Sequence, residues 1–133
     1  MKSAAVAPNM QRLIRVLIVD DEPLFTEMLQ ALLQVEEGID VVGKAQHGRQ
    51  GVQLANDLDP DVIVMDVSMP VMNGIDATRE IRDRDPTATI LILTGGSSIT
   101  EIDQARTAGA AAYLTKDRIG GELVDEIRSL GTK

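Results

Sequence analysis

The sequence predicts an α/β protein: a doubly wound, five-stranded parallel sheet in the strand order 2-1-3-4-5, flanked by five helices. Two observations support this prediction. Five short apolar runs of strand length alternate with segments whose apolar residues follow helical spacing. Turn residues mark several of the boundaries between them. Because connections between parallel strands are right-handed, this alternation places helices on both faces of the sheet.

The five predicted strands are runs of mostly aliphatic residues, which is typical of strands buried on both faces. In chain order they occupy residues 16–19, 41–43, 62–65, 90–93 and 110–114. Turn residues precede the third and fourth strands and end the fourth helix. These are Asp59-Pro60-Asp61, Asp85-Pro86 and Ala108-Gly109-Ala110.

The predicted helices follow each strand, and four of them show a clear stripe of residues three or four positions apart. In chain order, the first contains Leu24, Met28 and Leu32, the third Ile75, Thr78 and Ile81, the fourth Ile99, Ile102 and Ala105, and the fifth Leu123, Ile127 and Leu130. Each segment is long enough for a crossover between parallel strands.

The chain has the size of one compact domain, with 133 residues of which 44% are hydrophobic. We expect this domain over 13–131, preceded by a flexible tail over 1–12. Cysteine is absent, and no apolar run approaches the ~20 residues that span a bilayer, so we expect a cytoplasmic protein without membrane contact.

The charge balance disfavours direct binding to nucleic acid. Acidic residues outnumber basic ones by 21 to 13, so the net charge repels phosphate. The aromatic side chains are Phe25 and Tyr113, which are too few to form a stacking platform for bases.

Polar residues follow four of the five predicted strands at the point where each strand ends. They are Asp20 and Asp21, Asp66, Thr94 and Lys116. The carboxyl ends of parallel strands share one edge, and ligands bind there where the strand order reverses. In the order 2-1-3-4-5 this point lies between the first and third strands, so the three aspartates are expected to converge.

Three converging carboxylates repel one another unless some are protonated or a cation binds between them. Mg²⁺ fits best, because it prefers oxygen ligands and commonly binds one or two carboxylates together with a phosphate oxygen. Lys116 would add a compact positive charge and Thr94 a hydroxyl donor for the phosphate, while Asp66 is left as the nucleophile.

Each residue also has an ordinary structural interpretation. Asp21 before Glu22-Pro23 suits the N-cap of a helix, and Asp66 could open a turn. Thr94 and Lys116 are common at strand ends. The meeting of four strand ends at one edge favours a phosphate-handling site.

At these residues the sequence resembles the receiver domains of two-component response regulators, in particular the NarL type, which have a flavodoxin-like fold. The resemblance covers about residues 14–130. It rests on Val16-Leu17-Ile18-Val19-Asp20-Asp21, Asp66 with Met69-Pro70 and Gly74, Leu93-Thr94-Gly95, and Tyr113-Leu114-Thr115-Lys116.

The resemblance implies that Asp66 receives a phosphoryl group from a sensor histidine kinase in a Mg²⁺-dependent reaction that the domain itself catalyses. Asp21 would bind Mg²⁺ directly and Asp20 through water, with Asp66 and the Ser68 carbonyl completing the protein ligands. Lys116 would pair with the phosphoryl oxygens.

The resemblance also implies a switch, in which Thr94 moves toward the phosphoryl group and Tyr113 changes rotamer. The fourth helix, fifth strand and fifth helix, at about 99–130, would then contact an output domain or partner protein. For the NarL type this output is usually a DNA-binding domain that regulates transcription. Whether the chain forms a homodimer is left open.

Two features depart from the common pattern of that family. Asp117 follows Lys116 where many members have a proline with a cis bond, so the shape of this loop is not predicted. Small residues at 95–98 follow Thr94, and we expect them to ease water access and shorten the lifetime of the phosphoryl group.

Two other classes of function are compatible with parts of the pattern. One is a Mg²⁺-dependent phosphatase with an aspartyl nucleophile, but such enzymes usually place the nucleophile on the first strand with a second aspartate two residues on. Here Asp20 is followed by Asp21 and Glu22. The other is a docking module that works without phosphorylation, which would not need the complete set of acids, threonine and lysine.

Overall fold

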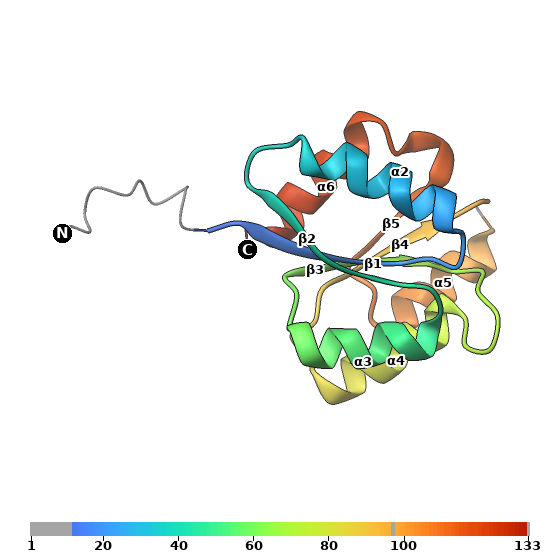
Figure 1. Ribbon diagram of the computed structural model, residues 1–133. Helices are drawn as coiled ribbons and strands as arrows, with labels where there is room; N and C mark the ends of the chain where they lie inside the picture. Colours follow the sequence, from blue (N-terminus) through green and yellow to red (C-terminus); the bar gives the residue numbers. More distant parts are fainter. Residues whose placement is uncertain (1–11, 97, 133) are drawn as a thin grey trace.

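The computed structural model describes residues 12–96 and 98–132, which form one sheet with helices on both sides (Figure 1). The strands are β1 (Ile14–Val19), β2 (Ile39–Ala45), β3 (Val62–Asp66), β4 (Ile90–Thr94) and β5 (Ala112–Thr115). The helices are α2 (Pro23–Gln34), α3 (Gly48–Leu58), α4 (Gly74–Arg84), α5 (Ile99–Ala108), the short 3₁₀ helix η2 (Lys116–Arg118) and α6 (Gly121–Gly131).

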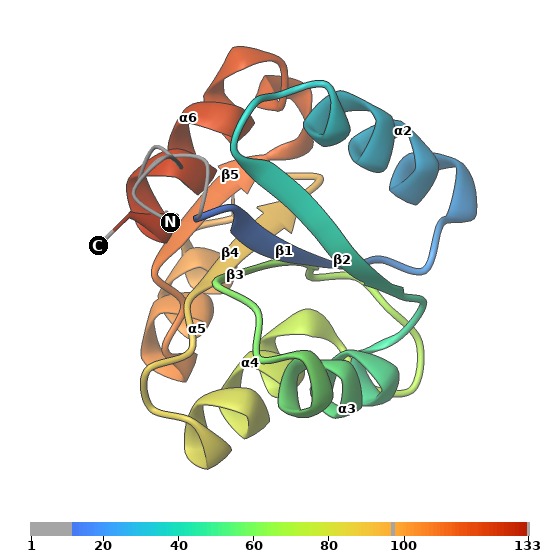
Figure 2. The ribbon, with the colours of Figure 1, turned by 60° about the vertical axis from the view of Figure 1, so that its left-hand side comes forward.

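The sheet confirms the predicted topology. All neighbouring strands are parallel, and their order is β2-β1-β3-β4-β5. Helices α2 and α6 cover one face, and α3, α4 and α5 cover the other (Figure 2). The strand order therefore reverses between β1 and β3, as the sequence predicts.

The core consists of two aliphatic layers, because successive side chains of a strand point to opposite faces. In β1, Val16 and Ile18 pack with α2 and α6, whereas Leu17 and Val19 pack with α3, α4 and α5. Residues of β3 and β4 are buried on both faces. The central strands are thus packed into both layers of the core.

Several predicted strand boundaries are wrong, because β1 and β2 each begin two residues earlier than predicted, at Ile14 and Ile39. β5 begins at Ala112, two residues later than the apolar run suggests. The backbone N–H of Ala110 is used to close α5, where it donates to the Ala105 carbonyl at 3.0 Å. Gly109 ends that helix with a φ of 108°, a left-handed conformation that glycine adopts readily.

Helix α2 is present, but its buried side differs from the stripe that predicts it. Leu24 and Met28 are 82% and 45% exposed, whereas Thr26, Leu29 and Leu33 face the sheet. Apolar residues surround much of this helix, so several stripes have acceptable spacing and packing selects among them.

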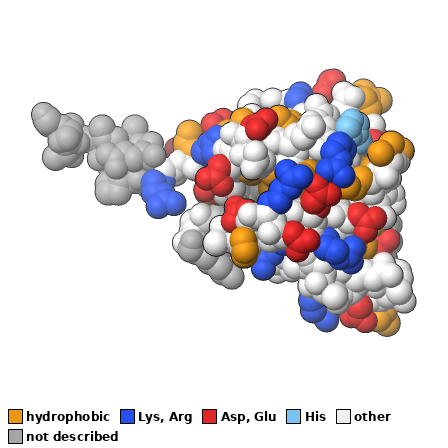
Figure 3. All heavy atoms as spheres, turned by 90° about the horizontal axis from the view of Figure 1, so that it is seen from below, with side chains coloured by type: hydrophobic (Ala, Val, Ile, Leu, Met, Phe, Trp, Pro, Cys, Tyr) orange, Lys and Arg blue, Asp and Glu red, His pale blue; other side chains and the backbone are white. Residues whose placement is uncertain are grey.

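The face of the molecule formed by α3 and α4 carries interspersed basic and acidic side chains (Figure 3). Arg49 of α3 contacts Glu80 of α4 at 2.6 Å, and Arg84 contacts the same carboxylate at 3.1 Å. Such exposed pairs contribute little stability, and their mixed sign leaves no basic stripe for nucleic acid on this face.

The predicted tail over 1–12 lies, apart from Arg12, outside the described residues, so it stays a prediction. Among the helices of the described residues, none is both long and apolar enough to cross a membrane.

Candidate phosphoryl-accepting site

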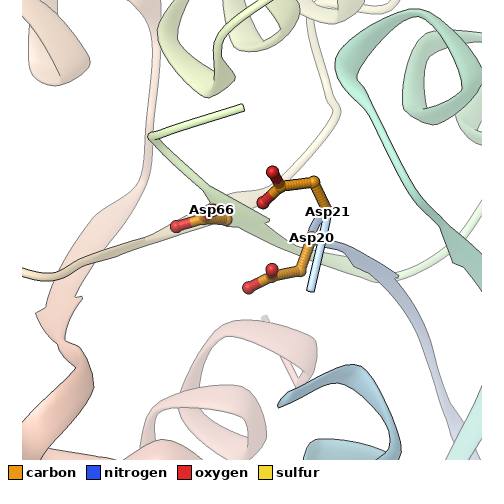
Figure 4. Close-up of side chains that lie close together, drawn as sticks. All are labelled: Asp20, Asp21 and Asp66. Carbon is orange, nitrogen blue, oxygen red and sulfur yellow. The ribbon is translucent and has the colours of Figure 1, made fainter. Parts of the chain in front are cut away.

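Three aspartates meet at the edge of the sheet where the strand order reverses (Figure 4). Asp20 and Asp21 follow β1, and Asp66 is the last residue of β3. Each offers a carboxylate oxygen, and these atoms all lie within 4.8 Å of one another. Asp20 and Asp66 are only 1% and 4% exposed, while Asp21 is half-buried.

The register of the sheet explains why these side chains meet. Val19 of β1 pairs with Met65 of β3, so the residues that follow them lie side by side. The start of α4 closes against the same place, where the Gly74 N–H donates to the Val67 carbonyl at 2.9 Å. A Cβ at Gly74 would overlap the Asp66 carbonyl oxygen, so this approach requires glycine.

Lys116 approaches the acids from the end of β5, an outer strand of the sheet. It begins η2 directly after β5, and its Nζ lies 3.2 Å from Asp66 Oδ1 and 3.3 Å from Asp20 Oδ2. Glu22 Oε1 is farther away at 3.8 Å. Asp117 follows Lys116 at the position where many members of the family that the sequence resembles have a cis proline. The described residues contain no cis peptide bond, so Lys116 approaches the acids without one.

Phe25 lies beneath the lysine. The Lys116 ammonium is 4.3 Å from the centroid of the Phe25 ring, within the range of a cation–π interaction. Phe25 is on the first turn of α2, where it is half-buried. The lysine is therefore held by carboxylates and by an aromatic face.

The surroundings of Asp20 and Asp66 disfavour the ionised form of these two acids. Burial and then the charge of Asp20 raise the pKa of Asp66 to about 6, against a lowering by Lys116. Burial also raises the pKa of Asp20, although the Glu22 N–H and Lys116 oppose this. Burial alone would lower the pKa of Lys116, but the charges of Asp66 and Asp20 outweigh it and raise that pKa.

The donor set fits a hard divalent cation. Three carboxylate oxygens converge, and one lysine carries too little charge to neutralise all three acids. Ser68, whose carbonyl is the expected fourth ligand, lines the same open groove as Asp21. Among the backbone hydrogen bonds of the described residues outside helices and strands, none ends on that carbonyl.

Thr94 ends β4 and is buried, but its hydroxyl contacts none of the three aspartates among the described hydrogen bonds. It lies 2.6 Å from Glu101 Oε1 and 2.8 Å from the Gly96 carbonyl oxygen. Tyr113 of β5 is 42% exposed and lines a surface hollow with Ile102 and Arg106 of α5.

The interpretation of Asp21 as a helix N-cap is wrong. The N-cap position of α2 belongs to Glu22, whose side chain makes no capping hydrogen bond. The neighbouring Asp20 instead accepts from the Glu22 N–H at 2.9 Å through Oδ1. Asp21 is thus left with its carboxylate directed to the acid cluster (Figure 4).

The sequence did not identify three residues of this region, namely Glu22, Phe25 and Glu101. Glu22 and Phe25 follow the Asp20-Asp21 pair closely on the chain, and that proximity was a usable signal. Glu101 lies seven positions after Thr94 with a helix start between them, so no local pattern joins the two.

Comparison with known proteins shows which family the chain belongs to. The model of the response regulator receiver domain matches residues 16–128. The transcriptional regulatory protein LiaR of Bacillus subtilis is 38% identical over 117 residues, which cover 88% of this chain and 56% of LiaR. A protein-glutamate methylesterase/protein-glutamine glutaminase of Alkalilimnicola ehrlichii is 43% identical over 129 residues, covering 89% of this chain and 33% of that protein.

Solved structures show the same architecture. A LuxR-family response regulator from Aurantimonas superposes with a TM-score of 0.87 and 35% identity, covering 90% of this chain and 86% of that one. The receiver domain of a NarL regulator from Mycobacterium tuberculosis gives a TM-score of 0.87 with 29% identity, covering 91% and 98%. The chain spans about half the length of the first curated relatives. From the family match and the site geometry together, this chain belongs to the response regulator receiver domains of two-component signalling.

Proposed function

We propose that Asp66 accepts a phosphoryl group from the phosphohistidine of a sensor histidine kinase. One observation carries the assignment. Asp66 is a buried carboxylate whose Oδ1 lies 3.2 Å from the Lys116 ammonium, with oxygens of Asp20 and Asp21 within 4.8 Å. Asp66 is itself the last residue of β3, whereas Asp20 and Asp21 follow the end of β1 and contribute negative charge beside it.

In the proposed reaction, a carboxylate oxygen of Asp66 attacks phosphorus as the phosphorus–nitrogen bond of the phosphohistidine breaks. The imidazole nitrogen leaves with the electron pair, and Asp66 becomes an acyl phosphate. Lys116 then pairs with a phosphoryl oxygen in place of the Asp66 carboxylate. Water later attacks phosphorus, the bond between phosphorus and the Asp66 oxygen breaks, and inorganic phosphate leaves, which regenerates the Asp66 carboxylate. The domain thus catalyses both steps on its own side chain and is not a conventional turnover enzyme.

Asp21, Asp66 and the Ser68 carbonyl would hold Mg²⁺ directly, and Asp20 through water. When bound, Mg²⁺ would neutralise negative charge on the acids and on the phosphoryl oxygens. The raised pKa of Asp66 means that part of this acid is protonated near pH 6, so a nearby cation also favours its nucleophilic, ionised form.

For the output, we propose control of transcription through a DNA-binding domain in a cytoplasmic regulator. LiaR is a transcriptional regulatory protein, and so are other relatives of this chain. The exposed Tyr113 and the hollow beside Ile102 and Arg106 support a contact surface on α5, β5 and α6 for that domain, for a partner or for a second copy.

Mass spectrometry after incubation with acetyl phosphate and Mg²⁺ tests the acceptor. The wild-type chain is expected to gain the mass of one phosphoryl group, and Asp66→Ala is expected to gain none. Asp83→Ala, at an exposed aspartate of α4, is the matched control and should label like wild type. A phosphoryl group that persists in Asp66→Ala would remove Asp66 as the acceptor, and turnover of phosphate monoesters would favour a phosphatase.

A further inference from the structure

The hydroxyl of Thr94 forms a hydrogen bond with Glu101, a residue that has no part in the proposed phosphotransfer. It lies 2.6 Å from Glu101 Oε1 and 2.8 Å from the Gly96 carbonyl, and it accepts from the Gly96 N–H at 3.2 Å. A hydroxyl has one hydrogen, so it donates to one acceptor at a time. The shorter contact is to a carboxylate, the stronger kind of acceptor.

Glu101 is well placed to hold this contact. It lies in the first turn of α5, whose N-cap Ser98 accepts from the Glu101 N–H at 3.4 Å. Its side chain therefore reaches back from the helix to the end of β4. It also lines the open groove that contains Asp21 and Ser68, next to the acid cluster.

We propose that Glu101 is a positioning residue that holds Thr94 in its unphosphorylated arrangement and opposes the switch. The proposal rests on the proposed function, since it assumes that Thr94 donates to the phosphoryl group on Asp66. With a single hydrogen, Thr94 donates either to Glu101 or to that group. Phosphorylation therefore breaks the bond to Glu101, and the strength of this bond sets part of the equilibrium between the two states.

The coupling is reciprocal. If phosphorylation releases Glu101, then anything that moves Glu101 away favours the phosphorylated arrangement. The start of α5 is thereby tied energetically to Asp66, although no bond joins them directly. A ligand that binds the first turn of α5 more tightly when Glu101 is released would bind the phosphorylated protein more tightly, and would raise the affinity of the site for a phosphoryl mimic by the same factor.

Nuclear magnetic resonance of the metal-free protein tests the resting contact. Tyr113, on the strand beside β4, serves as reporter because it lies outside the bonds that the substitution removes. In Glu101→Ala, the Tyr113 resonances are expected to shift part of the way toward their positions in the wild-type complex with Mg²⁺ and beryllofluoride. In Glu101→Gln, which keeps an acceptor oxygen at the same reach, they should stay near wild type.

Titration with beryllofluoride in saturating Mg²⁺ measures the energetic effect, since this anion mimics an aspartyl phosphoryl group. Glu101→Ala is expected to bind it roughly three- to tenfold more tightly than wild type. Asp103→Asn is the control for a general effect of charge, because it removes an exposed carboxylate that pairs with Arg106 on the same helix and does not contact Thr94. This variant should not tighten binding.

The outcomes distinguish this proposal from the proposed function. If the wild type binds no beryllofluoride and takes no phosphoryl group, the assignment of Asp66 fails. A second outcome would overturn the role of Glu101 and leave the assignment of Asp66 intact. In it, the wild type binds beryllofluoride, Glu101→Ala binds it equally or more weakly, and the Tyr113 resonances of that variant do not shift. Equal tightening by Asp103→Asn would show a general effect of lost negative charge on anion binding rather than the loss of the Thr94–Glu101 hydrogen bond, and would also overturn the role of Glu101.

Discussion

Lys116 is the residue on which the charge balance of the site depends. It bridges Asp66 and Asp20 at 3.2 and 3.3 Å, and it is 23% exposed. Partial burial makes its solvation poorer, so each contact around its ammonium matters more than at the surface. The contact with the Phe25 ring is one of these.

Replacing Phe25 tests the contribution of the ring. Phe25→Leu keeps an apolar side chain but removes the face beneath the ammonium, a contact worth roughly 0.5–2 kcal/mol. We expect phosphorylation by acetyl phosphate to slow a few-fold, whereas Phe25→Tyr, which keeps the ring, should retain the rate. Equal rates in the leucine and tyrosine variants would show that packing alone is needed.

Val71 is strained in the loop after Asp66. Its φ is 69°, a left-handed conformation that a β-branched residue rarely adopts, and its side chain is 96% exposed. Val71→Asn is therefore expected to raise the free energy of unfolding by about 1 kcal/mol, because asparagine tolerates this conformation. Urea denaturation measures the gain.

Val35→Asn provides the control for that prediction. Val35 is also exposed, at 80%, but its φ is −81°, so the same substitution relieves no strain there. An equal gain at Val35 would contradict the assignment of strain to Val71.

At the scale of elements, the close docking of α4 on the end of β3 positions Asp66. Gly74→Ala would place a Cβ against the Asp66 carbonyl and 2.8 Å from its carbon, so α4 or Asp66 must move. We expect a loss of roughly 2–3 kcal/mol in stability together with slower phosphorylation. Thermal unfolding and acetyl phosphate labelling measure these two effects.

Gly121→Ala is the matched control, because α6 also begins at a glycine but a Cβ there meets nothing within 4 Å. This variant should be as stable as wild type or slightly more so. A similar loss in both variants would indicate that glycine at a helix start, rather than contact with Asp66, is what matters.

We expect the connection from β4 to α5 to affect the access of water to Asp66. A Cβ at Gly96 meets nothing within 4 Å, so the backbone accepts a side chain there. We expect Gly96→Tyr to slow loss of the phosphoryl group on the order of a few-fold by obstructing water. Phosphoryl release after removal of the donor measures this, with Gly120→Tyr, also at an open position, as control. An unchanged rate in Gly96→Tyr would rule out control of water access by this loop.

At the scale of the whole molecule, the buried acids set a dependence of stability on pH. The pKa of Asp66 rises from 3.8 to about 6 on folding, so between about pH 4 and 6 the folded state binds more protons than the unfolded state. Stability therefore falls as pH rises through this window. The expected loss from Asp66 is roughly 1–3 kcal/mol in metal-free protein.

Urea denaturation in chelator across this pH range measures the loss. Asp66→Asn should be more stable than wild type above pH 6 and should flatten the curve, because the buried charge is gone. Stability that instead rises with pH in the wild type, or an Asp66→Asn curve of the same slope, would contradict the assignment. Added Mg²⁺ should restore much of the wild-type loss, since a bound cation favours the ionised acids.

The sequence by itself determined the order of the elements, the topology of the sheet, and the edge at which Asp20, Asp21 and Asp66 meet. These follow from local apolar runs and from the rule that parallel strands end at one edge. Only the tertiary structure decided which side of α2 is buried, what Thr94 binds, and how Lys116 lies on Phe25. The physical reason is distance along the chain: Lys116 and Asp20 are 96 positions apart, and side-chain packing between such residues is not encoded in local spacing.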